Sequence, residues 1–223
     1  MDVSYKRGKI LCLCAGLCVL LFAASVARAS DVSFPVRFIP DGDTVVMLDG
    51  RSVRLAGIDA PEMPRDGKTG GLYSVQSRDV LRKYLAGGLI VLNMSNSGKD
   101  RFGRIVGEGK LPDGTSLNEV LVRDGAAWFY YHDDVPEELS KRLLRAQKKA
   151  IGEKRGMWAL VQAFDTAEKG YRGNKRSKRF FSSRCDAFNK ISYRNRVHFD
   201  NLIQAFLHGM APARSCSVWP AQP

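Results

Sequence analysis

The chain has few of the side chains that hold transition metals. It contains five cysteines and three histidines among 223 residues. Three of the cysteines fall in the first 18 residues, at positions 12, 14 and 18. Because protein zinc sites are built from clusters of cysteine and histidine, this composition argues against a zinc protein.

The N-terminal apolar run, Ile10–Ala24, is too short for an ordinary membrane span. A basic segment, Lys6–Lys9, precedes it, and the small-residue motif Ala27–Ala29 follows it. This order is typical of a secretory signal peptide. We therefore expect residues 1–29 to be removed by a cut after Ala29, which gives a secreted or periplasmic protein without stable membrane association. An uncleaved membrane anchor is the alternative.

Only two cysteines remain after such a cut, Cys185 and Cys216. An even pair in an exported chain favours a disulfide. The bridge would close a loop of about 30 residues and contribute roughly 3–4 kcal/mol to stability. Two buried free thiols are the other reading.

Acidic residues are outnumbered, with 23 Asp and Glu against 35 Lys and Arg, and the net charge is +12. Residues 1–29 hold four basic residues and one acidic residue, a net +3, so the mature chain keeps +9. A charge of this sign favours polyanionic partners and speeds their encounter. Nucleic acids, membranes and cell walls all qualify, and the sequence shows no internal repeat.

Short β-rich runs and amphipathic segments alternate along the chain. Asp49-Gly50 is typical of a hairpin turn, and Asn118 is expected to cap a short helix that Gly125 ends. Strands are predicted over 44–48, 52–58, 89–94 and 104–106, with 116–117 after a turn at 112–114, and helices over 72–85, 118–124 and 137–153.

The composition changes after Leu160. Residues 169–184 form a basic run that contains Phe180-Phe181, and a solvated tail and an additional nucleic-acid contact both remain open for it. Apolar residues between Phe199 and Met210 recur at helical spacing, so this segment is predicted to be a helix that docks on the rest of the protein.

Three motifs carry the chemistry. They are Asp41-Gly42-Asp43-Thr44, Val53-Arg54-Leu55-Ala56-Gly57-Ile58-Asp59-Ala60-Pro61-Glu62 and Asp100-Arg101-Phe102-Gly103-Arg104. Carboxylates such as Asp43 and Asp59 are the ligands that hard cations prefer. A further carboxylate can accept a proton from attacking water, and arginine forks match phosphate oxygens. The residue types together predict metal-assisted attack on a phosphodiester.

The order and spacing of these motifs resemble the staphylococcal nuclease (thermonuclease) family, over roughly Val36 to Leu160. The resemblance implies a calcium-dependent endonuclease that cleaves DNA and RNA with little sequence preference and leaves a 3′-phosphate and a 5′-hydroxyl. Together with the signal peptide and the change of composition after Leu160, it divides the chain into three parts: a signal peptide over 1–29, a nuclease domain over 30–160 and a basic C-terminal extension over 161–223. The resemblance itself does not reach the extension. The fold it implies is α+β, a five-stranded OB-type β-barrel with about three helices, and the extension adds a helix.

The resemblance also assigns roles. Asp43 and Asp59 match calcium ligands, and Ala60 matches a position that supplies a backbone carbonyl to the metal. The catalytic matches are Arg54, Glu62 and Arg104. The expected substrate contacts are Arg101, Phe102 and Tyr131.

Two features complicate this reading. In an ideal strand Arg54 and Asp59 point to opposite faces, so a bulge at Gly57 is needed to bring them together. Phe102 lacks the hydroxyl of the tyrosine that the family carries there. The expected partner is nucleic acid and the expected state is a monomer. The rival readings are a non-catalytic OB-fold nucleic-acid-binding module and a cell-envelope interaction protein.

Overall fold

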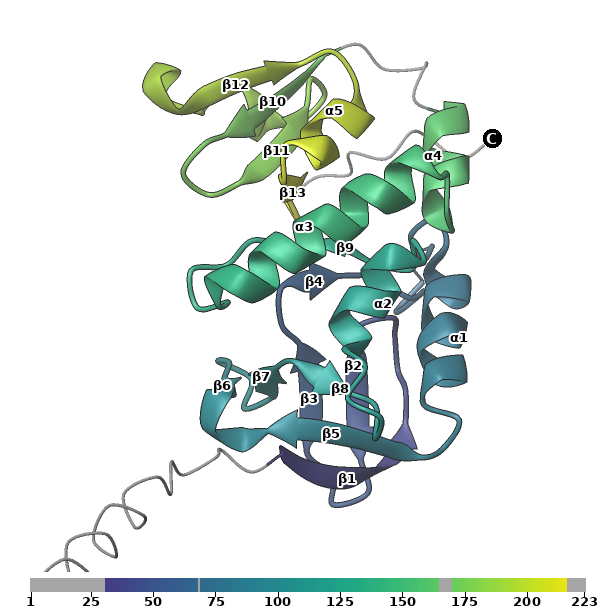
Figure 1. Cartoon of the computed structure of the whole chain (residues 1–223). Coiled ribbons are helices and arrows are strands. Elements are labelled where there is room, and N and C mark those ends of the chain that lie inside the picture. The colour runs from purple at the N-terminus through teal and green to yellow at the C-terminus, as the bar shows by residue number, and fades with distance from the viewer. Residues whose placement is uncertain (1–30, 68, 165–169, 216–223) are drawn as a thin grey trace, which may run out of the picture.

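The computed structural model describes residues 31–67, 69–164 and 170–215. Figure 1 shows a lower body rich in strands, an upper body formed by the C-terminal residues, and a long helix between them. The predicted signal peptide lies outside the described residues, as does Cys216, so the cleavage and the Cys185–Cys216 disulfide stay predictions. No helix in the described ranges has the length and hydropathy to cross a membrane.

The lower body is built on a seven-stranded sheet in the order β6-β7-β3-β2-β1-β5-β8. Neighbours are antiparallel except β3 and β7, which run parallel. The strands are β1 (Asp31–Phe38), β2 (Thr44–Met47), β3 (Ser52–Leu55), β5 (Leu89–Asn93), β6 (Gly98–Lys99), β7 (Ile105–Gly107) and β8 (Gly109–Lys110).

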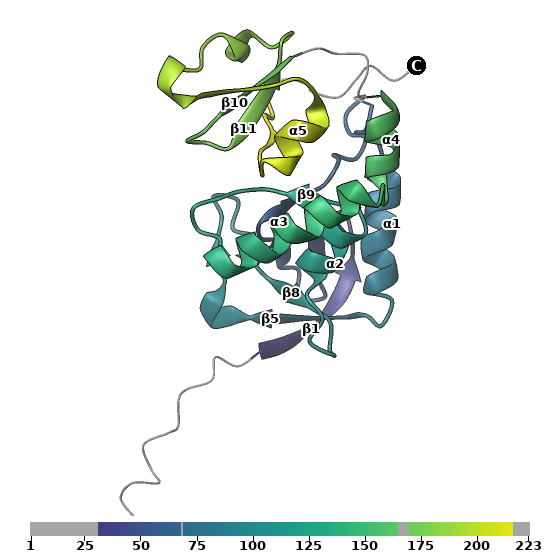
Figure 2. The same ribbon diagram turned by 45° about the horizontal axis from the view of Figure 1, so that its top comes forward.

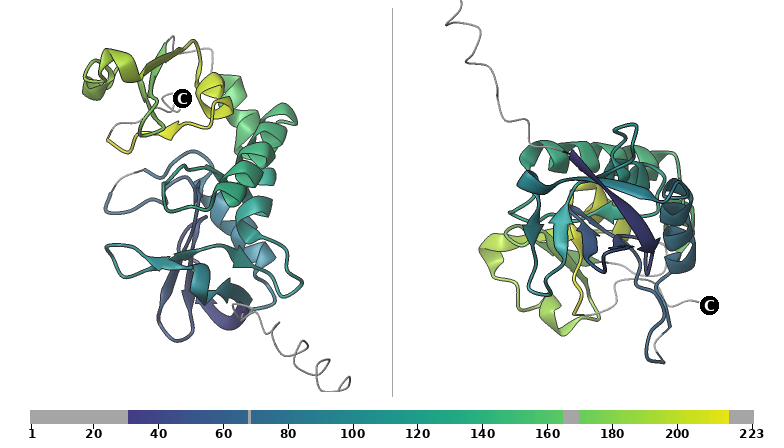
Figure 3. Two further views of the ribbon diagram at one scale, coloured as in Figure 1. Left: turned by 60° about the vertical axis from the view of Figure 1, so that its left-hand side comes forward. Right: turned by 90° about the horizontal axis from the view of Figure 1, so that it is seen from below.

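Glu108 alone separates β7 from β8, although these strands pair with opposite parts of the sheet, β3 and β5. The segment from β7 to β8 therefore connects the β3 side of the sheet to the β5 side. Seen from below, the strands are arranged around a common interior (Figure 3). The described strands form no closed barrel, so the predicted five-stranded barrel is not confirmed; the α+β class is. The sequence prediction missed β1, which contains Pro35 and is largely exposed.

The five α-helices of the described chain confirm most of the predicted helical segments. They are α1 (Ser74–Tyr84), α2 (Leu117–Arg123), α3 (Glu137–Gly152), α4 (Met157–Phe164) and α5 (Leu202–Leu207), and single 3-10 turns occupy 94–96, 186–188 and 193–195. The prediction that Asn118 caps α2 is wrong. Ser116 is the cap, and its side chain accepts a hydrogen bond from the backbone N–H of Glu119. Asn118 is fully buried and uses its amide to join Ala56 O to Gly109 N–H.

The C-terminal extension is a folded unit rather than a solvated tail. Its four strands, in the order β12-β10-β11-β13, are β10 (Tyr171–Asn174), β11 (Arg179–Ser182), β12 (Arg196–Phe199) and β13 (Ala211–Pro212). The basic run thus forms the β10–β11 hairpin, in which Phe180 is fully buried and Phe181 is not. Phe199, predicted to be helical, ends β12, and the helix is only α5.

The extension packs on α3 and α4 and shares a core with them. The rings of Trp128, Trp158 and Phe180 each contact Phe206 edge-to-face. Figure 2 shows α5 lying above α3, between the two sheets. The predicted boundary between 160 and 161 falls inside helix α4.

Candidate active site

The predicted metal ligands come together around one guanidinium. The guanidinium of Arg54 lies between two carboxylates, with Nη1 2.9 Å from Asp43 Oδ2 and Nη2 2.6 Å from Asp59 Oδ1. Both carboxylate side chains are less than a tenth exposed. A charged fork held by two buried acids in this way is a preorganised charge cluster.

The local backbone explains how Arg54 and Asp59 meet. Strand β3 ends at Leu55, and Gly57 takes a left-handed φ of 73° before the short strand β4 (Ile58–Asp59) begins. A side chain at Gly57 would lie 2.7 Å from a methyl carbon of Leu143, so the site needs glycine for space as well as for φ. The predicted break at Gly57 is confirmed, as a turn rather than a bulge within one strand.

Asp43 is fixed by its neighbours. Its Oδ2 accepts the backbone N–H of Ala60 at 2.8 Å, and its Oδ1 accepts the hydroxyl of Thr44 at 3.0 Å. The preceding Gly42 packs so closely that a Cβ would lie 1.9 Å from Ser77 Oγ. The Asp-Gly-Asp-Thr motif is therefore a packed turn that holds Asp43 toward Arg54.

The carboxylate pair fits a hard cation. Burial raises the pKa of Asp43 to about 8; the charge of Arg54 opposes the rise, and the charges of Asp41 and Asp59 add to it. A cation between the two acids would stabilise both ionised forms. Within the described ranges no third His, Cys, Asp or Glu joins them, so any further ligands would be backbone carbonyls, water or substrate oxygens.

Glu62 and Arg104, the other predicted catalytic residues, lie outside this hydrogen-bonded cluster: the charge of Glu62 acts on Arg214, and Arg104 pairs with Asp100. The Glu62 side chain is exposed to solvent. Arg104 immediately precedes β7, in which Val106 pairs with Arg54, so strand alternation places Arg104 on the same outer face as Arg54. Its guanidinium Nε donates to Asp100 Oδ2 at 2.8 Å.

Asp100 organises the predicted substrate-binding loop. Its carboxylate also accepts the backbone N–H groups of Phe102 and Arg104, at 2.9 and 3.0 Å. Phe102 is 68% exposed, and the guanidiniums of Arg101 and Arg104 lie 4.7 and 5.5 Å from its ring centre. The loop thus presents an exposed ring between two cations.

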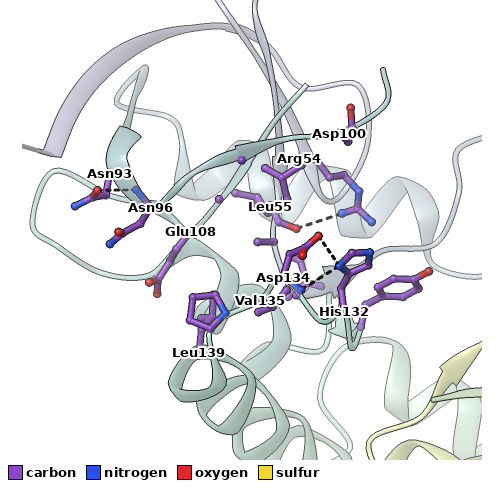
Figure 4. Close-up of a pocket in the computed structure, with 18 of the residues that line it drawn as sticks. Arg54, Leu55, Asn93, Asn96, Asp100, Glu108, His132, Asp134, Val135 and Leu139 are labelled. Atoms are coloured by element: carbon purple, nitrogen blue, oxygen red, sulfur yellow. Dashed lines mark hydrogen bonds and ion pairs between the residues drawn. The ribbon is translucent and has the colours of Figure 1, made fainter. Parts of the chain in front are cut away.

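A cavity of about 520 Å³ opens beside Arg54. Figure 4 shows Arg54 and Leu55 on one side of it and His132, Asp134 and Leu139 across from them. Tyr130 also lines the cavity, whereas the predicted base contact, Tyr131, uses its hydroxyl to donate to Asp133 at 2.7 Å.

The sequence interpretation missed the contribution of the extension. Arg214, two residues beyond β13, places Nη2 2.6 Å from the same Asp59 Oδ1 that Arg54 contacts. Burial is the largest single influence and opposes its charged form, but the charge and the hydrogen bond of Asp59, together with Tyr130 and Glu62, outweigh burial and raise the pKa of Arg214. Arg179 stacks on Tyr130 at 3.5 Å. Arg179 belongs to the basic run that the sequence analysis noted, whereas no local sequence pattern indicates a functional role for Arg214.

Two buried acids, a largely buried arginine between them and an adjoining cavity are features of an enzyme that acts on anionic phosphate esters. Comparisons with known proteins identify the family to which the chain belongs. Residues 52–160 match the family model described as staphylococcal nuclease homologue. An uncharacterized endonuclease of Escherichia coli is 34% identical over 144 residues, which is 63% of this chain and 86% of that protein.

Two further relatives are more distant. A micrococcal nuclease of Shigella flexneri is 27% identical over 164 residues, 69% of this chain and 88% of its own length. A probable endonuclease of Komagataella phaffii is 29% identical over 121 residues, 52% of each chain. The chain belongs to the staphylococcal nuclease family and is a hydrolytic nuclease, a phosphodiesterase by class. The family model stops at residue 160 and leaves the extension unmatched.

Proposed function

We propose that this protein is a calcium-dependent endonuclease that hydrolyses DNA and RNA with little sequence preference. The observation that carries the proposal is the placement of Arg54 between the buried acids Asp43 and Asp59. Two buried carboxylates from separate segments meet at the Arg54 guanidinium, beside a cavity that Lys99 and Asp100 also line. Calcium suits a site with few protein carboxylates, because it accepts carbonyl and water ligands in flexible geometry.

The residues divide the chemistry as follows. Asp43, Asp59 and the carbonyl of Ala60 would hold the calcium ion, which when bound polarises a phosphoryl oxygen. Glu62, which is exposed to solvent, orients the attacking water and accepts its proton. Arg54 and Arg104, on one face of the sheet, bind the phosphate as its charge develops.

Substrate binding uses the cavity and the loop next to Arg54. The ring of Phe102 offers a nucleotide base a stacking surface. Arg101 and Arg104, which flank this ring, offer two cations to the phosphates of the nucleic-acid backbone. Tyr131 is the proposed second aromatic contact. None of these groups is placed to read a base edge from a recognition helix, which accords with low sequence preference.

We also propose that the lower body has the OB-type fold of this family, and that the mature protein is an exported monomer. The N-terminal charge and apolar pattern support export. Calcium is plentiful outside the cytoplasm, which suits a weak site.

The test is cleavage of labelled single-stranded DNA and of RNA by the mature chain in calcium, in magnesium and in excess chelator. We expect cleavage of both polymers in calcium and none in chelator. Full activity in chelator would refute calcium dependence. Tight binding without cleavage under every metal condition would instead favour the non-catalytic binding module.

A further inference from the structure

The C-terminal extension reaches the candidate active site through Arg214, which lies outside the matched family region 52–160 and adds a second guanidinium to Asp59 beside that of Arg54. The contact spans 155 residues of sequence. Asp59 is 7% exposed at its side chain, whereas Arg214 is 58% exposed. The arginine therefore touches the buried acid with one nitrogen and presents much of its fork to the solvent side of the site.

The extension holds this arginine firmly. Ala213 donates its backbone N–H to Phe180 O at 3.0 Å, and Ala211 donates to Lys178 O at 2.9 Å, so the chain is tied to β11 up to the residue before Arg214. Strand β11 in turn rests on the core around Phe206. Arg214 is thus presented from a packed sheet.

The same extension contacts the turn that shapes the site. Tyr130 donates its backbone N–H to Gly57 O at 2.8 Å, and Gly57 is the turn between Arg54 and Asp59. Arg179 and Arg214 place their guanidinium carbons 3.5 and 5.4 Å from the centre of the Tyr130 ring. Arg179 also donates to Tyr131 O at 2.8 Å. Arginine stacked on an aromatic face keeps its in-plane N–H groups available for anions.

Asp59 has two arginine partners. Arg54 alone already reaches both acids, so Asp59 Oδ1 carries a second cation at the same distance of 2.6 Å. Because Arg54 already pairs with Asp59, this acid does not depend on Arg214 for a partner, and the exposed part of the Arg214 fork can bind an anion.

We propose that Arg214 is a substrate-binding residue of this nuclease, a guanidinium from the C-terminal extension that binds a phosphate of the nucleic-acid backbone next to Asp59. The inference rests on the proposed function, because it assigns a role toward the substrate of that site. The extension is then one wall of the active site and not an appendage to it.

The test measures binding of a fluorescently labelled trinucleotide of DNA by anisotropy, in excess chelator, with a gel confirming that the probe stays intact. Arg214→Ala is compared with Arg176→Ala, which removes the same charge from the exposed β10–β11 turn. Loss of a charge-assisted contact should weaken binding roughly 10-fold or more for Arg214→Ala. Binding by Arg176→Ala should stay near that of the wild type. Arg214→Lys, which keeps the charge but loses the fork, should fall between them.

The salt dependence of binding gives a second readout. Removing one phosphate contact on a single strand should make the log–log slope shallower by about 0.7 in Arg214→Ala. The slope should be unchanged in Arg176→Ala. Thermal melting of both variants shows that the folds are equally intact, as expected for a half-exposed side chain.

Three outcomes overturn the proposal. Equal affinities of the two alanine variants would make Arg214 a structural partner of Asp59 only. Tighter binding or faster cleavage by Arg214→Ala would make it an autoinhibitory contact. Weaker trinucleotide binding by Arg214→Lys than by Arg214→Ala would show that the positive charge of residue 214 does not bind the substrate. Failure of the proposed function looks different, since the wild type would then bind the trinucleotide through Arg214 yet cleave no nucleic acid with any metal.

Discussion

The side chain of Gln147 in α3 donates its amide Nε2–H to the backbone carbonyl of Phe206 in α5 at 2.7 Å. The same side chain accepts the backbone N–H of Phe129 at 2.7 Å and is fully buried. One amide thus satisfies a backbone group of the nuclease body and another of the extension. The two parts are joined by an interaction that solvent cannot replace.

Gln147→Leu should therefore destabilise the whole chain. It leaves the buried N–H of Phe129 without its partner, which costs about 1–3 kcal/mol. It also removes one of the hydrogen bonds to the Phe206 carbonyl, which still accepts the N–H of Gly209. Urea unfolding should show a lower midpoint and still a single transition. Gln76→Leu, on the exposed face of α1, is the matched control and should change stability by less than about 0.5 kcal/mol. Two separate transitions in the wild type would show that the extension folds independently.

Gly57→Ala should lower both stability and activity. The substitution puts a Cβ 2.7 Å from Leu143 at a backbone φ of 73°, so the turn between Arg54 and Asp59 must move. Gly50→Ala is the control, because it carries a similar φ of 85° with nothing within 4 Å. We expect Gly57→Ala to lose more cleavage rate than Gly50→Ala at equal fractions folded. Equal rates would show that the turn does not set the site.

Asp100→Asn should loosen the substrate-binding loop. Burial opposes the charged carboxylate, but the Arg104 side chain and the backbone N–H groups of Arg104 and Phe102 outweigh it and lower the pKa of Asp100. A lowered pKa in the folded state means a contribution to stability that is present above about pH 4 and lost as pH falls below it. We expect weaker substrate binding at pH 7 and a difference from wild type that shrinks in acid. A difference that persists unchanged below pH 3 would contradict this reading.

Glu62→Gln and Arg104→Ala should each slow the chemical step while the protein stays folded, since both side chains lie outside the hydrogen-bonded cluster. Loss of one preorganised charge contact costs typically about 3–4 kcal/mol of transition-state stabilisation. Single-turnover cleavage at saturating calcium measures it. Arg101→Ala is the control for Arg104→Ala, because it removes a neighbouring charge that is assigned to binding, and its effect should appear in KM. A near-normal single-turnover rate in either of the first two variants removes that residue from the mechanism.

The sequence indicated Asp43, Arg54 and Asp59 because they lie in local motifs that resemble those of the staphylococcal nuclease family. The structure brings these three side chains together, and their roles stay predictions. The prediction failed for contacts made over long sequence separations. Arg214 meets Asp59 only because β13 is paired with β11 and the extension is packed on α3, and neither relationship has a local signature.

The extension itself was misread for a related reason. Lysines and arginines in 169–184 suggested a solvated tail, yet the alternation around Phe180 is that of a hairpin whose buried face is covered by residues far away in the chain. Strand β1 was missed because it contains Pro35 and most of its side chains are exposed, although it pairs with both β2 and β5.

The central claim is that the acids held by Arg54 carry out metal-assisted hydrolysis, and Asp59→Asn tests it most directly. The measurement is the initial rate of single-stranded DNA cleavage across a calcium titration, with Asp49→Asn, an exposed acid paired with Arg51, as the control. We predict a rate at least 100-fold below wild type for Asp59→Asn, following the roughly 3 kcal/mol typical of such contacts, and a normal curve for Asp49→Asn. A wild-type rate and calcium midpoint in Asp59→Asn would contradict the account.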